Sequence, residues 1–371
     1  LSPVDSDIVL YIVVATALAF DFTNGFHDTA NVVATSISTR ALPPRLAVGI
    51  ASILNFVGAF ISLEVAATVA QGIVDADKVT STVVFAGLIG AISWNLITWY
   101  FGLPSSSSHA LIGGLVGAVI AGGAASDVIW SGVLGKVVVP ALIAPVLAFT
   151  TAIVGIVVVY RVVGKLRPGP VTHGFKLGQV ASGGLLALAH GTNDAQKTMG
   201  VITLALIAHG NIPSNDFHVP EWVVVLSASA IALGTYTGGW RIIKTMGSRI
   251  IKMDSAQGFS SQGAGAAVIL AASHYGYPLS TTHVISGGVM GSGAAKRLSA
   301  VRWGVAGNIA LAWLLTLPAA AAMGAITYGV TRIFGTGAAG PLIVSIALLL
   351  TVAAVFVRRL QRGSALTAEV V

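Results

Sequence analysis

The stretch Pro104-Ser105-Ser106-Ser107-Ser108-His109 decides how this 371-residue chain folds, because a closely similar stretch recurs in its second half. That second copy reads Pro278-Leu279-Ser280-Thr281-Thr282-His283. Each copy interrupts an apolar run with a proline, several hydroxyls and a histidine, and a glycine-spaced apolar run that predicts a helix follows. A polar break repeated within apolar sequence long enough to cross a bilayer is typical of a transport site.

The composition is that of a polytopic membrane protein. Hydrophobic residues make up 55% of the chain and charged residues 9%, and the mean hydropathy is +0.88. A soluble domain of this length needs far more polar side chains to cover its surface. We therefore expect an all-α polytopic membrane protein with about ten to twelve helical segments, several of them short or broken. The absence of cysteine excludes disulfides and thiolate metal sites.

Basic residues gather in alternate loops of this predicted helical array. These loops contain Arg40 and Arg45, then the segments 161–176, 241–252, 296–302 and 358–362. By the positive-inside rule they face the cytoplasm, which places the amino terminus outside and the carboxyl terminus inside. The net charge of +7 therefore reflects membrane orientation. We expect membrane lipid as a partner, and no nucleic acid.

The same orientation makes the two halves of the chain inverted relative to each other. The first serine-rich break lies in a segment that leaves and returns to the outside, and the second lies in one that leaves and returns to the inside. Two inverted-topology repeats with broken helices and re-entrant hairpins are the expected architecture. The predicted units are a first repeat (1–160), a basic cytoplasmic linker (161–176), a second repeat (177–357) and a cytoplasmic tail (358–371).

Each half also begins with a polar motif that contains an aspartate. The two motifs run from Asn24 to Asn31 (NGFHDTAN) and from His190 to Lys197 (HGTNDAQK). Glycine predicts a loosened, unwound helix in each motif, and a carboxylate follows three residues later at membrane depth. A buried aspartate costs about 2.5 to 3.5 kcal/mol on insertion scales, so Asp28 and Asp194 are candidate functional residues.

The serine-rich breaks predict an anion site. Pro104 and Pro278 end the preceding helices, and the hydroxyls that follow can cap new helices beginning near His109 and His283. Free amides and hydroxyls at a helix N-terminus bind anions. Two such ends from opposite halves could meet near the midplane and hold a tetrahedral oxyanion. The candidate ligands are the hydroxyls of Ser106, Ser107, Ser108, Ser280, Thr281 and Thr282.

The aspartate motifs offer hard oxygen ligands instead. Carboxylates and side-chain amides suit Na⁺, a proton or a divalent cation; the candidates are Asp28, Asp194, Asn31, Asn193 and Gln196. An anion carried beside two carboxylates requires a cation bound with it. Lys197 stands where the first motif has Asn31, and we expect it to pair with an aspartate or with the anion.

Several less specific interpretations compete with these. Hydroxyls in membrane helices often bond to their own helical turn, and the aspartates could be structural partners of Lys197. His109 and His283 could hold the helix starts or handle protons. A hydrolase built from them and the adjacent serines is not favoured, because adjacent residues on a helix do not face each other. Asp21 and Glu64 lie in apolar sequence but have no counterpart in the other half.

The four motifs together resemble the paired signatures of the inorganic phosphate transporter (PiT) family, in the same order and over nearly the whole chain. The resemblance is closest to the bacterial low-affinity type. It implies a secondary active symporter in the inner membrane of a prokaryote, a homodimer, importing inorganic phosphate. Neither an enzyme activity nor a cofactor is expected. The resemblance adds Thr29, Gln196 and Lys197 as substrate-binding residues, and His27 to the cation site with Asp28, Asp194, Asn31 and Asn193.

His27 and Lys197 stand where the family more often has asparagine. Because these residues adjoin the two aspartates, H⁺ and Na⁺ both stay open as the coupling cation, as does Mg²⁺ carried with phosphate in a neutral complex. A permease for another tetrahedral oxyanion such as sulfate, or an uncoupled anion channel, is the alternative. No Gly-x-x-x-x-Gly-Lys-Ser/Thr string occurs, which excludes an ATP-driven pump of that type.

Overall fold

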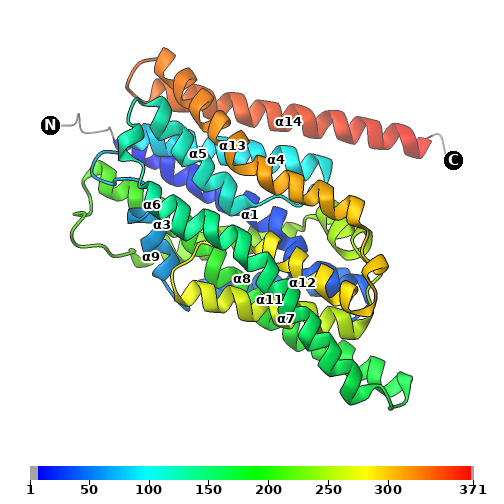
Figure 1. Cartoon of the computed structure of the whole chain (residues 1–371). Coiled ribbons are helices and arrows are strands. Elements are labelled where there is room, and N and C mark those ends of the chain that lie inside the picture. The colour runs from blue at the N-terminus through cyan, green and yellow to red at the C-terminus, as the bar shows by residue number, and fades with distance from the viewer. Residues whose placement is uncertain (1–6, 369–371) are drawn as a thin grey trace.

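Helices make up most of residues 7–368, the part of the chain that this computed structural model describes (Figure 1). The predicted all-α class is confirmed. The described residues form fourteen α-helical segments, more than expected, because α3, α6 and α10 are too short to stand out as apolar runs. In chain order they are α1 (Asp7–Ser38), α2 (Pro44–Gly58), α3 (Glu64–Gln71), α4 (Ser81–Phe101), α5 (Ser107–Ala121), α6 (Trp130–Gly132), α7 (Val139–Val163), α8 (Pro168–His209), α9 (Glu221–Thr237), α10 (Trp240–Lys244), α11 (Ser255–His274), α12 (Thr281–Lys296), α13 (Trp303–Ile333) and α14 (Ala339–Ala368).

Four helices in the described region are long and apolar enough to cross a membrane. They are α1, α4, α13 and the continuous helix Trp130–Val163, in which a π-helical stretch joins α6 to α7. A fifth candidate consists of α9 and the helix Trp240–Arg249, which meet at a 60° bend. Several apolar spans in one chain make this a multi-pass membrane protein.

The two serine-rich breaks form the turns of two helical hairpins. In the first, α4 ends at Phe101 and is capped by Gly102, which has a φ of +67°, and α5 begins at Ser107. In the second, α11 ends at His274, Gly276 turns the chain with φ +69°, and α12 begins at Thr281. The 15 residues of α5 span only about 22 Å, less than the roughly 30 Å hydrocarbon core. The expected broken helices are therefore present at both sites.

Each hairpin is covered by a helix from the other half of the chain. Helix α13 packs against α4 and α5, and α7 packs against α11 and α12 (Figure 1). Glycines make this packing close. A Cβ atom on Gly117 would lie 2.0 Å from the Ala321 carbonyl oxygen, and one on Gly291 would lie 2.2 Å from that of Phe149. The glycine-spaced runs after the two breaks thus let the helix backbones touch.

The aspartate motifs do not unwind their helices, so that prediction was wrong. Residues 24–31 lie inside α1 and residues 190–197 lie inside the 42-residue helix α8. The motif glycines serve packing instead. A Cβ on Gly25 would lie 2.4 Å from the Ile231 carbonyl oxygen on α9, and one on Gly191 would lie 2.1 Å from that of Asn55 on α2. The glycines therefore bring neighbouring helices close to the aspartates.

The three expected boundaries, at 160/161, 176/177 and 357/358, all fall inside helices. Helix α7 ends at Val163 and α8 begins at Pro168, so most of the segment predicted as a linker, 161–176, is helical and exposed. Helix α14 continues to Ala368, beyond the point where a tail was expected at 358. Residues 369–371 of that predicted tail lie outside the described part of the chain.

Candidate functional site

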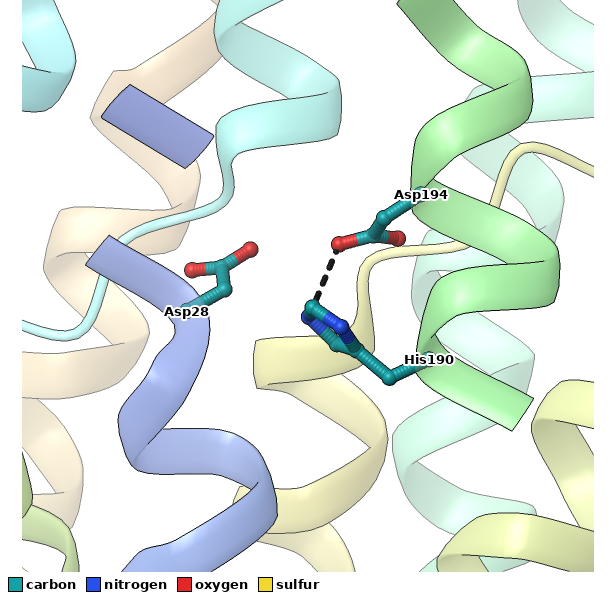
Figure 2. Close-up of side chains that lie close together, drawn as sticks. All are labelled: Asp28, His190 and Asp194. Atoms are coloured by element: carbon teal, nitrogen blue, oxygen red, sulfur yellow. Dashed lines mark ion pairs between the residues drawn. The ribbon is translucent and has the colours of Figure 1, made fainter. Parts of the chain in front are cut away.

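The four sequence motifs meet in the interior of the helical array. Asp28 projects from α1, and His190 and Asp194 project from α8 toward it (Figure 2). A carboxylate oxygen of each aspartate and a ring nitrogen of His190 all lie within 4.8 Å of one another. All three side chains are buried. The two halves of the chain thus contribute to one polar centre.

Asp28 receives donors from both hairpins. Ser107 Oγ, in the first turn of α5, donates a 2.6 Å hydrogen bond to Asp28 Oδ2. Thr282 Oγ1, in the first turn of α12, lies 3.4 Å from Asp28 Oδ1. The ring of His27 completes the set, with Nδ1 2.7 Å from the same Oδ1 atom. This carboxylate therefore lies where the two helix N-termini converge, which is the arrangement that the breaks predicted.

Asp194 is paired with a buried ammonium. Lys197 Nζ lies 2.5 Å from Asp194 Oδ1, and His190 Nε2 lies 3.1 Å from Oδ2. Thr281 Oγ1 donates to Oδ2 at 3.4 Å. Lys197 and Asp194 expose 1% and 0% of their surface. The expectation that Lys197 pairs with an aspartate is confirmed.

The last residue of each aspartate motif, Asn31 or Lys197, donates a hydrogen bond to the helical hairpin of the other half. Asn31 Nδ2 donates to Thr282 Oγ1 at 2.9 Å and to Thr281 Oγ1 at 3.3 Å. Lys197 Nζ donates to Ser108 Oγ and, at 2.8 Å, to the Leu279 carbonyl oxygen. Each aspartate helix is thereby tied to the start of a short helix from the other half.

Two of the predicted hydroxyls cap helices. Ser106 Oγ accepts a hydrogen bond from the His109 amide at 3.1 Å, and Ser280 Oγ accepts one from the His283 amide at 3.3 Å. The capping prediction is confirmed, with helices that begin two residues earlier than expected. The caps leave the hydroxyls of Ser107, Ser108, Thr281 and Thr282 directed at the aspartates and Lys197.

His109 and His283 pack against each other. Their ring centroids are 4.8 Å apart at an interplanar angle of 77°, and His283 also stacks on Trp313 at 4.1 Å. The two rings therefore join the hairpins of the two halves. A hydrolase would need hydrogen bonds between these rings and the adjacent serine hydroxyls. The hydroxyls of Ser106, Ser107 and Ser108 bond instead to Asp28, Lys197 and backbone groups.

Three other predicted site residues bond away from the carboxylate cluster. Thr29 Oγ1 donates to the carbonyl oxygens of Gly25 and Thr235. Gln196 Oε1 accepts hydrogen bonds from the amides of Val65 and Ala66, and so caps α3. Asn193 Nδ2 donates to Ser273 Oγ and to the carbonyl oxygen of Tyr277.

The structure adds residues that the sequence did not single out. His190 precedes Asp194 by four residues, so the two lie on one face of α8, and that spacing could have revealed it. Thr98 and Ser105 approach His27 Nε2 at 3.2 and 3.3 Å, contacts between distant segments that no local pattern indicates. Asp21 is fully buried on α1, whereas Glu64 is exposed at the start of α3.

The charges at this centre do not balance. Two carboxylates face one ammonium, so one negative charge stays uncompensated when the imidazoles are neutral. Removing charges from water costs several kcal/mol per ion unless each is paired. The centre therefore favours an additional cation, while the first turns of α5 and α12 present donors suited to an anion.

These features define a class of protein, a helical membrane transporter with a buried polar centre shared by two halves. Comparison with known proteins gives the family. The chain belongs to the phosphate transporter family, whose profile matches residues 24–170 and 166–324. It is accordingly a transporter and not an enzyme.

Curated relatives and a solved structure agree with this assignment. The chain is 53% identical over 350 residues to a probable low-affinity inorganic phosphate transporter of Mycobacterium bovis, covering 94% of this chain and 84% of that one. It is 43% identical over 323 residues to a protein of the same description from Bacillus subtilis, covering 86% and 96%. The solved structure of a sodium-dependent phosphate transporter matches with a TM-score of 0.81 and 25% identity, covering 88% of this chain and 99% of the other.

Proposed function

We propose that this protein is a secondary symporter that imports inorganic phosphate together with a cation. The observation that carries the proposal is the convergence of two helix N-termini on two buried carboxylates, through Ser107 and Thr282 at Asp28 and Thr281 at Asp194. The relatives described as phosphate transporters support the same substrate.

Phosphate would bind through the free backbone amides at the starts of α5 and α12, joined by the hydroxyls there once a cation on Asp28 and Asp194 takes their place at the carboxylates. A tetrahedral oxyanion accepts several hydrogen bonds, and these two helix ends offer neutral donors from two directions. An anion entering a centre that already has an excess negative charge is repelled. A cation bound first at Asp28 offsets that charge, so the two solutes favour each other's binding. This mutual dependence is the basis of symport.

The packing of the helices supports two inverted repeats. Helices α4 and α5 with α13 mirror helices α11 and α12 with α7, and both aspartate motifs lie on long helices packed against these hairpins. We propose that alternating access moves these elements around the shared site. The basic loops support an orientation with the amino terminus outside and the carboxyl terminus in the cytoplasm. The plasma membrane location and the homodimer follow from the family resemblance.

Two contacts bear on the identity of the coupling cation. The His27 ring lies 2.7 Å from Asp28 Oδ1, and imidazoles are the side chains that proteins most often use to relay protons, which favours H⁺. The triad of Asp28, His190 and Asp194 has the donor set for a divalent cation, which favours transport of a metal phosphate. The imidazole in that set suits Zn²⁺ better than Mg²⁺, which prefers all-oxygen coordination. Na⁺ would use the oxygen atoms alone.

Uptake of radiolabelled phosphate into proteoliposomes tests this function. The vesicles receive an imposed Na⁺ gradient, a proton gradient or neither, each with and without Mg²⁺ or Zn²⁺. Accumulation above equilibrium with one gradient establishes symport and identifies the cation, and loss of uptake on chelation identifies the metal phosphate. Rapid equilibration that no gradient drives uphill would indicate a channel and refute the proposal. Stronger competition by sulfate than by unlabelled phosphate would indicate a different oxyanion.

A further inference from the structure

Asn31 and Lys197 hold corresponding positions in the two aspartate motifs but differ by a full positive charge. Each follows its aspartate by three residues, and each donates to a hydroxyl in the first turn of the opposite hairpin. The amide of Asn31 is neutral, so within residues 7–368 the carboxylate of Asp28 lacks the lysine partner that Asp194 has. The two pseudo-equivalent halves of the centre are therefore electrically unequal.

The ammonium of Lys197 sits in a complete oxygen cage. Its three oxygen neighbours are a carboxylate oxygen of Asp194 at 2.5 Å, the hydroxyl of Ser108 at 2.5 Å and the carbonyl of Leu279 at 2.8 Å. An ammonium has three N–H donors, and this cage uses all three. None remains for an anion. Lys197 therefore does not act as a phosphate ligand in this conformation, although its charge lies in the substrate centre.

Carboxylate, hydroxyl and backbone carbonyl are also the ligands that hard metal cations prefer. We propose that Lys197 is a tethered cation, which occupies in the second half the position that a free monovalent cation would otherwise take. This inference rests on the proposed cation-coupled transport. A tethered charge binds without losing the translational freedom of a free ion and is not released during the cycle.

The consequence concerns the coupling ratio. With one cation position permanently filled, each cycle carries one free cation fewer than it would if both halves bound free ions. The position left for a free cation is at Asp28, where Ser107, Thr282 and His27 surround the carboxylate. Since each coupled ion multiplies the attainable concentration gradient of phosphate, Lys197 lowers the gradient that the protein can sustain.

Replacing the lysine by the residue of the other half tests this inference. In Lys197→Asn the cage loses its ammonium but keeps Asp194, Ser108 and the Leu279 carbonyl. The ratio of ²²Na⁺ to ³²P-phosphate taken up by proteoliposomes should rise by one in this variant relative to the unchanged protein. Lys197→Arg retains the charge and is the matched control. Its ratio should equal that of the unchanged protein, whatever its rate.

A binding measurement covers the case in which Lys197→Asn does not transport. The thermal stability of each detergent-purified protein is measured in NaCl and in choline chloride at one pH. Na⁺ should raise the Tm of Lys197→Asn more than that of the unchanged protein or of Lys197→Arg. An equal response in all three proteins, or an unchanged flux ratio in an active Lys197→Asn, would overturn the tethered cation. Absence of phosphate transport by the unchanged protein would instead refute the proposed function and leave the Na⁺ result interpretable.

Discussion

Ser107 Oγ on α5 donates a 2.6 Å hydrogen bond to Asp28 Oδ2 on α1, joining the first helical hairpin to the buried carboxylate of its own half. The contact matters because it links the two solutes of the proposed symport. The hydroxyl lies at a helix N-terminus that favours anions, and the carboxylate favours cations. A change in either group is therefore expected to alter the binding of both.

Removing this hydroxyl should weaken phosphate binding. In Ser107→Ala a buried hydrogen-bond donor is lost, and such a loss typically costs about 1 to 3 kcal/mol. If the phosphate-bound state bears this cost, the affinity for phosphate falls roughly 5- to 150-fold. Equilibrium binding of phosphate to purified protein measures this. Ser286→Ala is a matched control, since Ser286 is equally buried on α12 but contacts Met246. Equal affinities in the two variants would remove Ser107 from the site.

The two aspartates should differ in their contribution to stability. Asp194→Asn leaves the buried ammonium of Lys197 without its counter-ion, and breaking such a pair costs about 3 to 5 kcal/mol. Asp28→Asn removes a carboxylate that pairs with no lysine of the described chain, so it should lower the Tm less while abolishing cation-coupled uptake. Unchanged uptake in Asp28→Asn would contradict the assignment of the cation position.

A double substitution can show that the Asp194 effect arises from the lysine charge. Lys197→Met combined with Asp194→Asn removes both charges and keeps an apolar side chain of similar length. The double variant should be more stable than Asp194→Asn alone, because no uncompensated charge remains buried. Thermal unfolding in detergent provides the comparison. Additive losses in the double variant would show that the two side chains do not act as a pair.

The glycines that face the covering helices should not tolerate a methyl group. A Cβ on Gly117 would lie 2.0 Å from the Ala321 carbonyl oxygen, so Gly117→Ala must push α13 away from α5, and overpacking of this kind costs about 1 to 3 kcal/mol. Gly329→Ala on α13 is the control, because nothing lies within 4 Å of its Cβ position. The Tm should fall in the first variant and not in the second. Equal Tm values would mean that the helices do not pack this closely.

Gln196 should affect folding more than transport. Its side chain accepts hydrogen bonds from the Val65 and Ala66 amides at the start of α3, so Gln196→Ala removes a helix cap worth about 0.5 to 2 kcal/mol. We expect a lower Tm with an unchanged KM for phosphate. A raised KM would restore Gln196 to the substrate-binding role that the family resemblance implied.

Local sequence accounts for much of this architecture. The apolar composition predicted a helical membrane protein, and proline followed by hydroxyls predicted where α5 and α12 begin, because those residues end one helix and cap the next. The Asp28 and Asp194 carboxylates were found in the same way, since a charge in apolar sequence requires a compensating function or partner.

Other features could not be predicted from neighbouring residues. Gly25 and Gly191 suggested unwound helix, yet both lie in continuous helix and face the backbones of α9 and α2. A glycine that loosens a helix and one that admits a neighbouring helix look alike in sequence, because in both cases the missing Cβ is what matters.

The sequence by itself determined which segments are helical, where two of them break, and which side chains carry charge into the membrane interior. Each of these depends on properties of a residue and its near neighbours in the chain. Only the tertiary structure decided that Lys197 enters a cage made by Asp194, Ser108 and Leu279, while Asn31 meets two hydroxyls. Those partners come from segments far apart in the chain, and helix packing alone brings them within hydrogen-bonding distance.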